Sequence, residues 1–421
     1  MTDHDALLRA IVENPAEDTP RLMYADWLDD HADGFASPDS ARARAALIRD
    51  DVLMAQRDEY DPARLRWELI EKPLREREPW VKEVLPAAQR AVPPDAPVFR
   101  RGFPWCVRAT PTELLAKPEW FLGALPAGTF SFGAPDRSAA RLFESEHFAR
   151  FTGLHAQFTF LRTDAVKALA ESGHSKALEE MSSVFNGLDT TAVHALLRTS
   201  LFRQLVRLRF NALPAFGSNT VSAIRQARPG RLREFELSGS AVSPRHVESM
   251  LTAPALANLT RLSLAHNRLS LDGYEGLVRA DLPHLRDLDL TFTAPGPEGI
   301  RLLSTSPVMS RLRRLSFNAN HVNRALAAEL ANCHETSNLR VLHLAANAVG
   351  NSGAAAIARS PHLAGLLVLD LSQSQVGDEG IQAILDSPLA DSLVLLDLGV
   401  SPASEEMKEE LNARMGDRVR L

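Results

Sequence analysis

The segment LRVLHLAANAV (residues 339–349) is followed 27 residues later by LLVLDLSQSQV (366–376). Both segments have leucine at their first, fourth and sixth positions, and a small polar residue at the ninth. Side chains of a strand alternate between its two faces, so the fourth and sixth leucines point the same way. The pattern therefore predicts a short strand with one buried face, followed by a turn.

This pattern recurs along the second half of the chain. Successive copies lie 26 or 27 residues apart, and we number positions within each copy from its first residue. The clear copies start at Leu232, Leu259, Leu285, Leu312, Leu339, Leu366 and Leu393. Weaker copies start at Leu205, Leu178 and Phe151, and one more is expected near residues 124–150. A fixed period of this length predicts a stacked repeat array.

Each copy reads as a strand, a turn and a helix. Apolar residues return at helical spacing after the turn, as in Ile381, Ile384 and Leu385. Asparagine at the ninth position can bond the backbone of its own turn and of the neighbouring turn. One copy cannot bury its apolar face alone, so the copies must stack. Asparagine occupies the ninth position at Asn267, Asn320 and Asn347, and Ser240, Thr293 and Ser374 replace it elsewhere.

The repeated pattern L-x-x-L-x-L-x-x-N-x-L resembles the leucine-rich-repeat family. The segments 350–358 (GNSGAAAIA) and 377–385 (GDEGIQAIL) resemble its ribonuclease-inhibitor type. The resemblance implies an α/β fold over residues 151–421, namely a right-handed solenoid with parallel strands on the concave face and helices on the convex face. Residues 96–150 are expected to form an N-terminal cap or a degenerate repeat.

The third and fifth positions of each copy are expected to face the concave side, away from the core. Neighbouring strands lie about 4.8 Å apart, so side chains at one position touch along the array. The charges at the third position alternate in sign. They form either a self-satisfying cross-strand ladder or a surface that meets a partner. The residues involved are Arg207, Glu234, Arg261, Asp287 and Arg314.

Further along the array, the third position becomes apolar. Val341, Val368 and Leu395 are expected to form an exposed apolar row beside His343, Asp370 and Asp397 at the fifth position. An apolar strip flanked by polar groups is typical of a binding patch. The alternative is that the C-terminal segment or a loop covers it. If the row binds a partner, Val368→Asp is expected to abolish capture and to leave folding intact.

Residues 1–95 lack the repeat and read as several short helices. The segments 6–33 (ALLRAIVENPAEDTPRLMYADWLDDHAD) and 44–49 (RAALIR) resemble a bacterial repeat-companion domain, a small helical module that precedes repeat arrays. The segment 99–107 (FRRGFPWCV) is similar to the one that opens the solenoid in such proteins. The resemblance implies an architecture and no known activity.

Four aspartates and a histidine lie within DWLDDHADG (26–34). A calcium loop starting at Asp29 requires Glu at its twelfth position, where Ser40 stands. The interpretation that fits better is a helix whose buried face ends at Trp27 and Leu28, with a solvated acidic end stopped by Gly34. We therefore expect no metal at this stretch.

Composition excludes several function classes. Hydrophobic residues make up 45% of the 421 residues and the net charge is −6, which favours a soluble protein without a nucleic-acid or membrane partner. Two cysteines, Cys106 and Cys333, suit a reducing cytoplasm, and no secretory signal is visible. His334-Glu335 lacks the second histidine of a zinc-protease motif, and no P-loop or nucleophile elbow occurs. No catalytic residue, cofactor or metal is expected.

Three functions remain open on the sequence. The favoured one is a non-enzymatic scaffold or adaptor that binds a protein or peptide on its concave face, using the apolar row, its polar neighbours and Arg261, Asp287 and Arg314. A regulatory subunit or inhibitor of a partner enzyme is the alternative. An enzyme with a site in the N-terminal module would depend on Asp26, Asp29, Asp30, His31 or Asp33. The sequence does not identify the partner or the oligomeric state.

Overall fold

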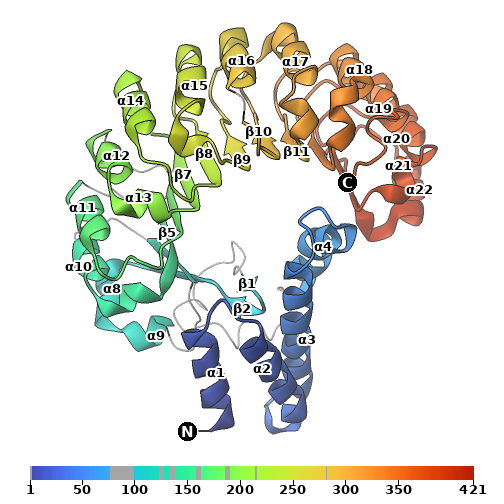
Figure 1. Cartoon of the computed structure of the whole chain (residues 1–421). Helices are drawn as coiled ribbons and strands as arrows, with labels where there is room; N and C mark the ends of the chain where they lie inside the picture. The colour runs from blue at the N-terminus through green and yellow to red at the C-terminus, as the bar shows by residue number, and fades with distance from the viewer. Residues whose placement is uncertain are drawn as a thin grey trace. The chain divides into compact units, whose positions relative to one another are not determined.

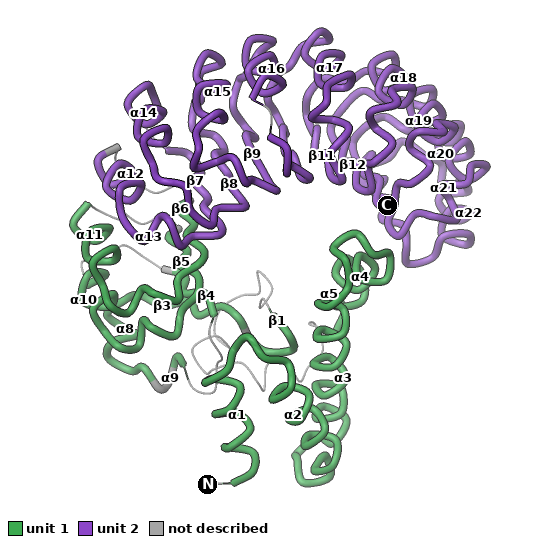
Figure 2. Tube along the Cα trace, viewed as in Figure 1, with its two compact units in different colours: residues 1–186 green, residues 187–421 purple. Residues whose placement is uncertain are grey.

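The computed structural model divides into two compact units, residues 1–186 and 187–421 (Figure 2). It describes residues 2–75, 99–122, 128–132, 138–157, 163–184, 190–213, 216–280 and 282–421. The predicted boundary at residue 95, and the part of the expected N-terminal helices beyond residue 75, lie outside the described residues.

Unit 2 contains a parallel sheet whose strands follow one another in chain order. Each strand pairs with the next at the same repeat position, as in Val341↔Val368↔Leu395, so the register repeats with the sequence period. The predicted α/β repeat fold is confirmed. The strands are β7 (Arg207–Asn211), β8 (Glu234–Ser238), β9 (Arg261–Ser263), β10 (Asp287–Asp289), β11 (Arg314–Ser316), β12 (Val341–His343), β13 (Val368–Asp370), β14 (Leu395–Asp397) and β15 (Val419–Arg420).

The strands line the inner side of the arc that unit 2 forms, and helices line its outer side (Figure 1). The α-helices are α12 (Thr190–Leu197), α13 (Ser200–Gln204), α14 (Ser218–Gln226), α15 (Pro244–Leu251), α16 (Ser270–Arg279), α17 (Gly296–Ser304), α18 (Arg324–Asn332), α19 (Gly350–Ala358), α20 (Asp378–Leu385), α21 (Leu389–Ser392) and α22 (Glu405–Met415). Short 3-10 turns are η4 (Pro254–Leu256), η5 (Met309–Arg311), η6 (His334–Asn338) and η7 (Gly416–Arg418).

Leucines and asparagines join the repeats, as the sequence predicts. Leu342 and Leu344 are fully buried between the sheet and the helices. The Oδ1 atom of Asn347 accepts hydrogen bonds from the backbone N–H groups of Asn320 and Val322 in the preceding turn, at 3.0 and 2.9 Å. Its Nδ2 atom donates to the carbonyls of Phe317 and Leu344, at 3.0 and 2.9 Å. One side chain thus satisfies buried backbone groups of two repeats.

Serine and threonine at the ninth position make fewer of these bonds. The hydroxyl of Ser374 donates to the Leu344 carbonyl at 2.7 Å and accepts from the Asn347 backbone at 3.4 Å. The Thr293 hydroxyl donates to the Leu290 carbonyl at 2.7 Å. The shorter side chains therefore preserve part of the ladder.

The eighth position of every repeat from Leu205 onward has a left-handed backbone. This conformation lets its N–H donate to a carbonyl of the next repeat, as Phe292 does to Asn318 and Ala346 to Ser372, both at 2.9 Å. Only one of these residues is glycine, the residue type that adopts this conformation without steric cost. The φ angles are 53–61° at Ala212, Gly239, His266, Phe292, Ala319, Ala346, Gln373 and Val400.

Unit 1 contains four further parallel strands of the same kind, β3 (Cys106–Ala109), β4 (Gly128–Phe132), β5 (Phe151–Gln157) and β6 (Glu180–Val184). Cys106 pairs with Thr129, and Thr129 with Gly153, at separations of 23 and 24 residues, so these repeats are shorter. The expected degenerate copy near 124–150 is present as β4 and α10. The accompanying helices are α8 (Pro111–Ala116), α9 (Pro118–Leu122), α10 (Ala139–Phe143), η3 (Glu146–Arg150) and α11 (Thr163–Glu171).

The N-terminal part of unit 1 is helical and includes a short antiparallel hairpin. Its elements are α1 (Asp3–Glu13), α2 (Thr19–Asp30), η1 (Ala32–Gly34), α3 (Pro38–Ala55), α4 (Pro62–Arg66), the π-helical turn η2 (Trp67–Glu71), α5 (Lys72–Arg75), β1 (Phe99–Arg100) and β2 (Phe103–Pro104). Tyr24 of α2, Ile48 of α3 and Phe103 of β2 share one buried core.

The stretch DWLDDHADG forms the end of helix α2, as predicted. The helix stops at Asp30, so the prediction that Gly34 stops it is wrong, since Gly34 lies in the following 3-10 turn. Asp26 and Asp29 both pair with Arg49 of α3, at 2.7 and 2.6 Å. Asp26 and Asp29 therefore link two helices, while Asp30, His31 and Asp33 are exposed, as predicted for the solvated end of the helix.

Candidate functional site

The candidate site is the inner face of unit 2, which we define as the side chains at the third and fifth positions of strands β7 to β14. The leucines at the fourth and sixth positions point to the helices, so the third and fifth point to the opposite side of the sheet. In-register pairing brings the residues of each position together across adjacent strands. All nine predicted site residues lie on this face: Arg261, Asp287, Arg314, Val341, His343, Val368, Asp370, Leu395 and Asp397.

The expected exposed apolar row is not exposed. Val341 and Val368 are each 2% exposed and Leu395 is 3% exposed, so this prediction is wrong. Each of these side chains has an in-register neighbour one strand away and a polar side chain two positions along its own strand. Compact apolar side chains packed between such neighbours lose nearly all of their contact with water.

This burial also changes the expected effect of Val368→Asp. Placing a carboxylate at a buried position without a partner costs several kcal/mol. The prediction that this substitution leaves folding intact is therefore wrong, and the accessible part of the inner face is its polar part.

The charged ladder at the third position is confirmed. The Arg261 Nε atom lies 2.8 Å from the Asp287 carboxylate and 4.0 Å from Glu234. On the preceding strands, Arg209 lies 3.7 Å from both Glu234 and Glu236. Burial lowers the pKa of the Arg261 guanidinium, an effect that Asp287 opposes and Arg314 adds to. Third-position charges thus pair across strands β8 to β10, and Arg209 at the fifth position of β7 extends these ion pairs by one strand.

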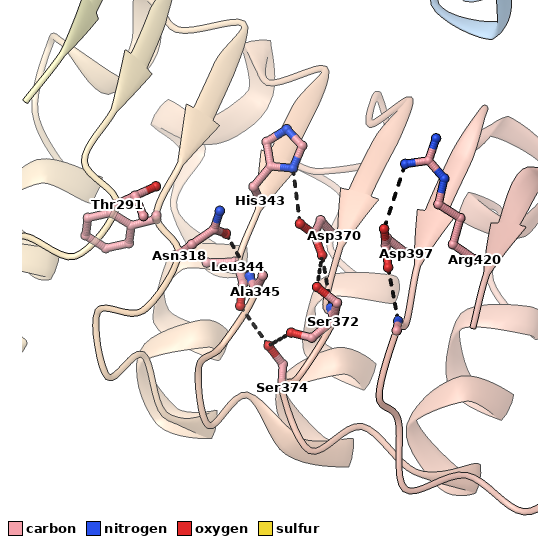
Figure 3. Close-up of polar contacts among 12 residues, drawn as sticks. Thr291, Asn318, His343, Leu344, Ala345, Asp370, Ser372, Ser374, Asp397 and Arg420 are labelled. Atoms are coloured by element: carbon pink, nitrogen blue, oxygen red, sulfur yellow. Dashed lines mark hydrogen bonds and ion pairs between the residues drawn. The ribbon is translucent and has the colours of Figure 1, made fainter. Parts of the chain in front are cut away.

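The fifth position carries a second polar row (Figure 3). The Nδ1 atom of His343 lies 3.5 Å from the Asp370 carboxylate. The backbone N–H and the hydroxyl of Ser372 donate to the same carboxylate at 3.0 and 2.7 Å. Burial tends to raise the pKa of Asp370, but the hydrogen bonds from His343 and Ser372 outweigh it, and its pKa lies below the ordinary value.

The arrangement around Asp370 recurs on two other strands. Thr291 donates its backbone N–H and its hydroxyl to Asp289 at 3.0 and 2.7 Å. Gly399 donates its backbone N–H to Asp397 at 3.0 Å, and Arg420 of β15 lies 4.0 Å from Asp397 (Figure 3). Each aspartate is held by the turn that ends its own strand, so its carboxylate keeps a fixed direction.

Exposed residues at the ridge beside the inner face were missed by the sequence reasoning. Phe292 is 50% exposed and Val400 is 79% exposed, and both have left-handed backbone. The rings of His266 and Phe292 lie 5.7 Å apart. The eighth position varies among alanine, glycine, aromatic and polar residues, so it carries no sequence pattern that would have identified it.

Both cysteine thiols have raised pKa values, which disfavours the reactive thiolate form. Burial raises the pKa of Cys106 to about 11. Burial, Glu335 and Glu329 raise the pKa of the Cys333 thiol. Among the residues that the structure describes, no group of three or more His, Cys, Asp or Glu side chains has the arrangement of a metal site.

Comparison with known proteins agrees with the repeat geometry. Residues 337–358 and 366–385 match the model of the family described as Leucine Rich repeat. The chain carries leucine-rich repeats. These two matches cover repeats whose strands are β12 and β13, the strands that contribute His343 and Asp370.

Solved structures of several other proteins are similar to the chain to different degrees. A chain from the yeast Rad7 and Elc1 complex is 13% identical with a TM-score of 0.53, and the match covers 98% of this chain and 91% of that one. An internalin from Listeria monocytogenes is 15% identical with a TM-score of 0.38, over 66% and 82% of the two chains. A chain of the TLR13–ssRNA13 complex is 16% identical with a TM-score of 0.39, over 72% of this chain and 40% of its own length.

No curated protein sequence matches the chain. Within the described ranges, no helix combines the length and the apolar character that crossing a membrane requires.

Proposed function

We propose that the protein is a non-enzymatic scaffold or adaptor that holds a protein or peptide partner on the inner face of its leucine-rich repeats. The observation that carries this proposal is the polar surface formed by the third-position charges of strands β7 to β11 and the fifth-position side chains of strands β7 to β14. Leucine-rich-repeat folds typically serve as binding surfaces. The surface offers both charges and hydroxyl groups on a rigid sheet, and it contains no activated nucleophile within the described residues.

The ion pairs of the inner face suit reversible binding. Arg209 and Arg261 are about one-third exposed, and partly exposed pairs contribute only about 0–1 kcal/mol each. A partner can therefore exchange them for its own charges at little cost. Such charges set orientation and association rate, while affinity depends on a few desolvated anchors.

The remaining assignments belong to the same proposal. Residues 1–95 form a repeat-companion module that serves as a docking or capping element. Residues 96–150 lead into the repeat array, and residues 151–421 form repeats of the ribonuclease-inhibitor type. The proposed location is the cytoplasm, with neither nucleic acid nor membrane as the inner-face partner. An inhibitory or regulatory role towards a partner enzyme is the alternative outcome of the experiment below.

Affinity capture with a variant of the inner face tests the proposal. Arg261→Ser, His343→Ser and Asp397→Asn combined remove polar groups of three strands. Because Arg261 pairs with the mostly buried Asp287 at 2.8 Å, circular dichroism is used to confirm that the variant folds. We expect the wild-type chain to retain a partner protein that the triple variant loses. Hydrogen exchange of the purified complex is expected to show protection at strands β9 to β14. Glu405→Gln, on exposed α22, is the control.

A partner retained equally by both proteins, or protection confined to the helices, would place binding elsewhere. An enzymatic activity assay of the captured partner, with and without this chain, separates an inhibitor from a scaffold.

A further inference from the structure

A groove of about 690 Å³ is lined by residues of helices α14 and α15. These two helices are neighbours on the outer side of unit 2 (Figure 1). From α14 it is lined by Ser218, Ser222 and Arg225, which share one helical face because they lie four and three residues apart. From α15 it is lined by Arg245 and Ser249. This surface is distinct from the inner face and has no role in the proposed function.

The groove carries positive charge without a compensating carboxylate. Helix α14 contains no acidic residue, and Glu248, the single acidic residue of α15, lies 3.6 Å from Arg279 of α16. Arg225 donates to the Ser249 hydroxyl at 3.3 Å. Within the described part of the chain, neither Arg225 nor Arg245 forms an ion pair, so the positive charge of the groove is open to an anion.

The neighbouring repeats show that this excess of charge is local. Arg279 occupies the same repeat position as Arg225, but it lies 2.9 Å from Glu275 on its own helix. The residue that corresponds to Glu275 in the earlier repeat is Val221. Arg301 of α17 is likewise paired, at 2.7 Å from Glu329. Arg279 and Arg301 are thus neutralised, whereas the arginines of the groove are not.

Hydroxyl groups and helix ends add further donors. Ser218 is the first residue of α14, and neither α14 nor α15 has a side-chain cap at its N-terminus. The partial positive charge of both helix ends therefore favours an anion nearby. The Ser218 hydroxyl lies 3.1 Å from the His246 Nε2 atom.

The Ser218–His246 pair lacks the features of a catalytic dyad. Burial, with a contribution from Arg245, lowers the pKa of His246. Its buried Nδ1 atom has no hydrogen-bond partner among the described residues, so no carboxylate orients the imidazole. The pair is a source of hydrogen bonds for a ligand rather than a nucleophile with its base.

We propose that this groove binds the phosphate group of a phosphorylated serine or threonine in a peptide segment of a partner protein. Two guanidinium groups and several hydroxyls match the charge and the acceptor oxygens of a phosphate monoester. The groove runs along both helices, with Arg245 near the start of α15 and Arg225 near the end of α14, and the lining hydroxyls lie between them. No Phe, Tyr or Trp lines it to stack a base, which favours a peptide over a nucleotide.

Fluorescence anisotropy with the full chain tests this assignment. The probe is a pool of labelled heptapeptides with central phosphoserine and randomised flanks, compared with the same pool unphosphorylated. We expect the phosphorylated pool to bind, and Arg225→Ala with Arg245→Ala to weaken it about tenfold or more, since each arginine supplies charge-assisted hydrogen bonds. Arg301→Ala removes the same charge from α17, where Arg301 pairs with Glu329 of α18 away from the groove, and is expected to leave binding unchanged.

A lysine variant separates the charge of the two arginines from their hydrogen-bonding geometry. Arg225→Lys with Arg245→Lys keeps the charge and is expected to bind more weakly than wild type but more tightly than the double alanine variant. Thermal unfolding confirms that all variants fold. Equal binding of the two pools, or equal effects of the groove variant and Arg301→Ala, would overturn the proposal. Binding of inorganic phosphate or adenosine monophosphate without binding of the phosphorylated pool would also overturn it.

Discussion

A single asparagine links neighbouring repeats more strongly than any surface ion pair of the array. Replacing Asn347 with alanine removes the acceptor for two buried N–H groups and the donor to two carbonyls. We expect Asn347→Ala to lower the free energy of unfolding by about 2 kcal/mol or more, because buried groups left unsatisfied cost about 1–3 kcal/mol each. Urea unfolding followed by circular dichroism measures this.

Asn347→Ser is the matched control for that substitution, since Ser374 already fills the equivalent position one repeat later. The free energy of unfolding of the serine variant is expected to fall by about half as much as that of the alanine variant. Equal losses for the two variants would show that the hydrogen bonds matter less than packing.

Asp370 gives the inner face a defined pH dependence. Its pKa is lowered in the folded state, so it contributes stability that is fully present above its ordinary pKa of 3.8. This contribution is lost as the pH falls through the lower, folded value. Asp370→Asn is therefore expected to flatten the acid limb of unfolding free energy measured between about pH 5 and pH 2. An unchanged acid limb would mean that other carboxylates dominate it.

At the scale of elements, Asp51 connects three parts of the N-terminal helices. Its carboxylate accepts hydrogen bonds from Trp67 Nε1 at 3.1 Å, Lys72 Nζ at 2.9 Å and the backbone N–H of Gly102 at 3.0 Å. Asp51→Ala leaves a mostly buried ammonium without its partner, and we expect a loss of about 3 kcal/mol in the unfolding of unit 1. Limited proteolysis is expected to cut near residue 75 first. An unaltered cleavage pattern would contradict this role.

The turn at the eighth repeat position is strained where its residue is branched. Val400 has a φ of 61° and is 79% exposed, so its side chain gains little packing to offset the strain. Asparagine tolerates this conformation better. Val400→Asn is expected to raise the free energy of unfolding by about 0.5–1 kcal/mol. Chemical denaturation measures the change, and a decrease would show that the turn is not strained.

The sequence predicted the elements where a periodic pattern dominates packing. The leucines at the fourth and sixth positions and the asparagine at the ninth located strands β7 to β14 and the turns that follow them. The inner face was predicted only in part, because exposure depends on neighbouring strands. Val341 and Arg261 occupy the same repeat position, but the short valine is covered while the longer arginine reaches water. The groove at Arg225 was missed, because Arg225 and Arg279 occupy the same repeat position in the sequence. Only the structure shows that Arg279 pairs with a carboxylate and that Arg225, among the described residues, does not.

For the whole molecule, the constant register allows an entire repeat to be removed. Deleting residues 339–365 places Leu366 where Leu339 stood, so Val368 replaces Val341 beside Arg314. Gly380 of α20 then replaces Gly353 of α19. At both positions an added Cβ atom would lie 2.8 Å from a valine side-chain atom of the same repeat, so the two helices meet the same steric requirement. The asparagine ladder continues from Asn320 to Ser374.

We expect this deletion variant to fold, with a lower midpoint of thermal unfolding, because the stability of stacked repeats is approximately a sum over repeats and their interfaces. Circular dichroism and size-exclusion chromatography check this. Deleting residues 340–359 removes a similar length but breaks the period, and it is expected to abolish cooperative unfolding. If the 339–365 variant also loses cooperative unfolding, the repeat at Leu339 contributes a specific contact that its neighbour cannot replace. If the 339–365 variant folds but loses the partner of the inner face, His343 and its strand are needed for binding rather than for the array.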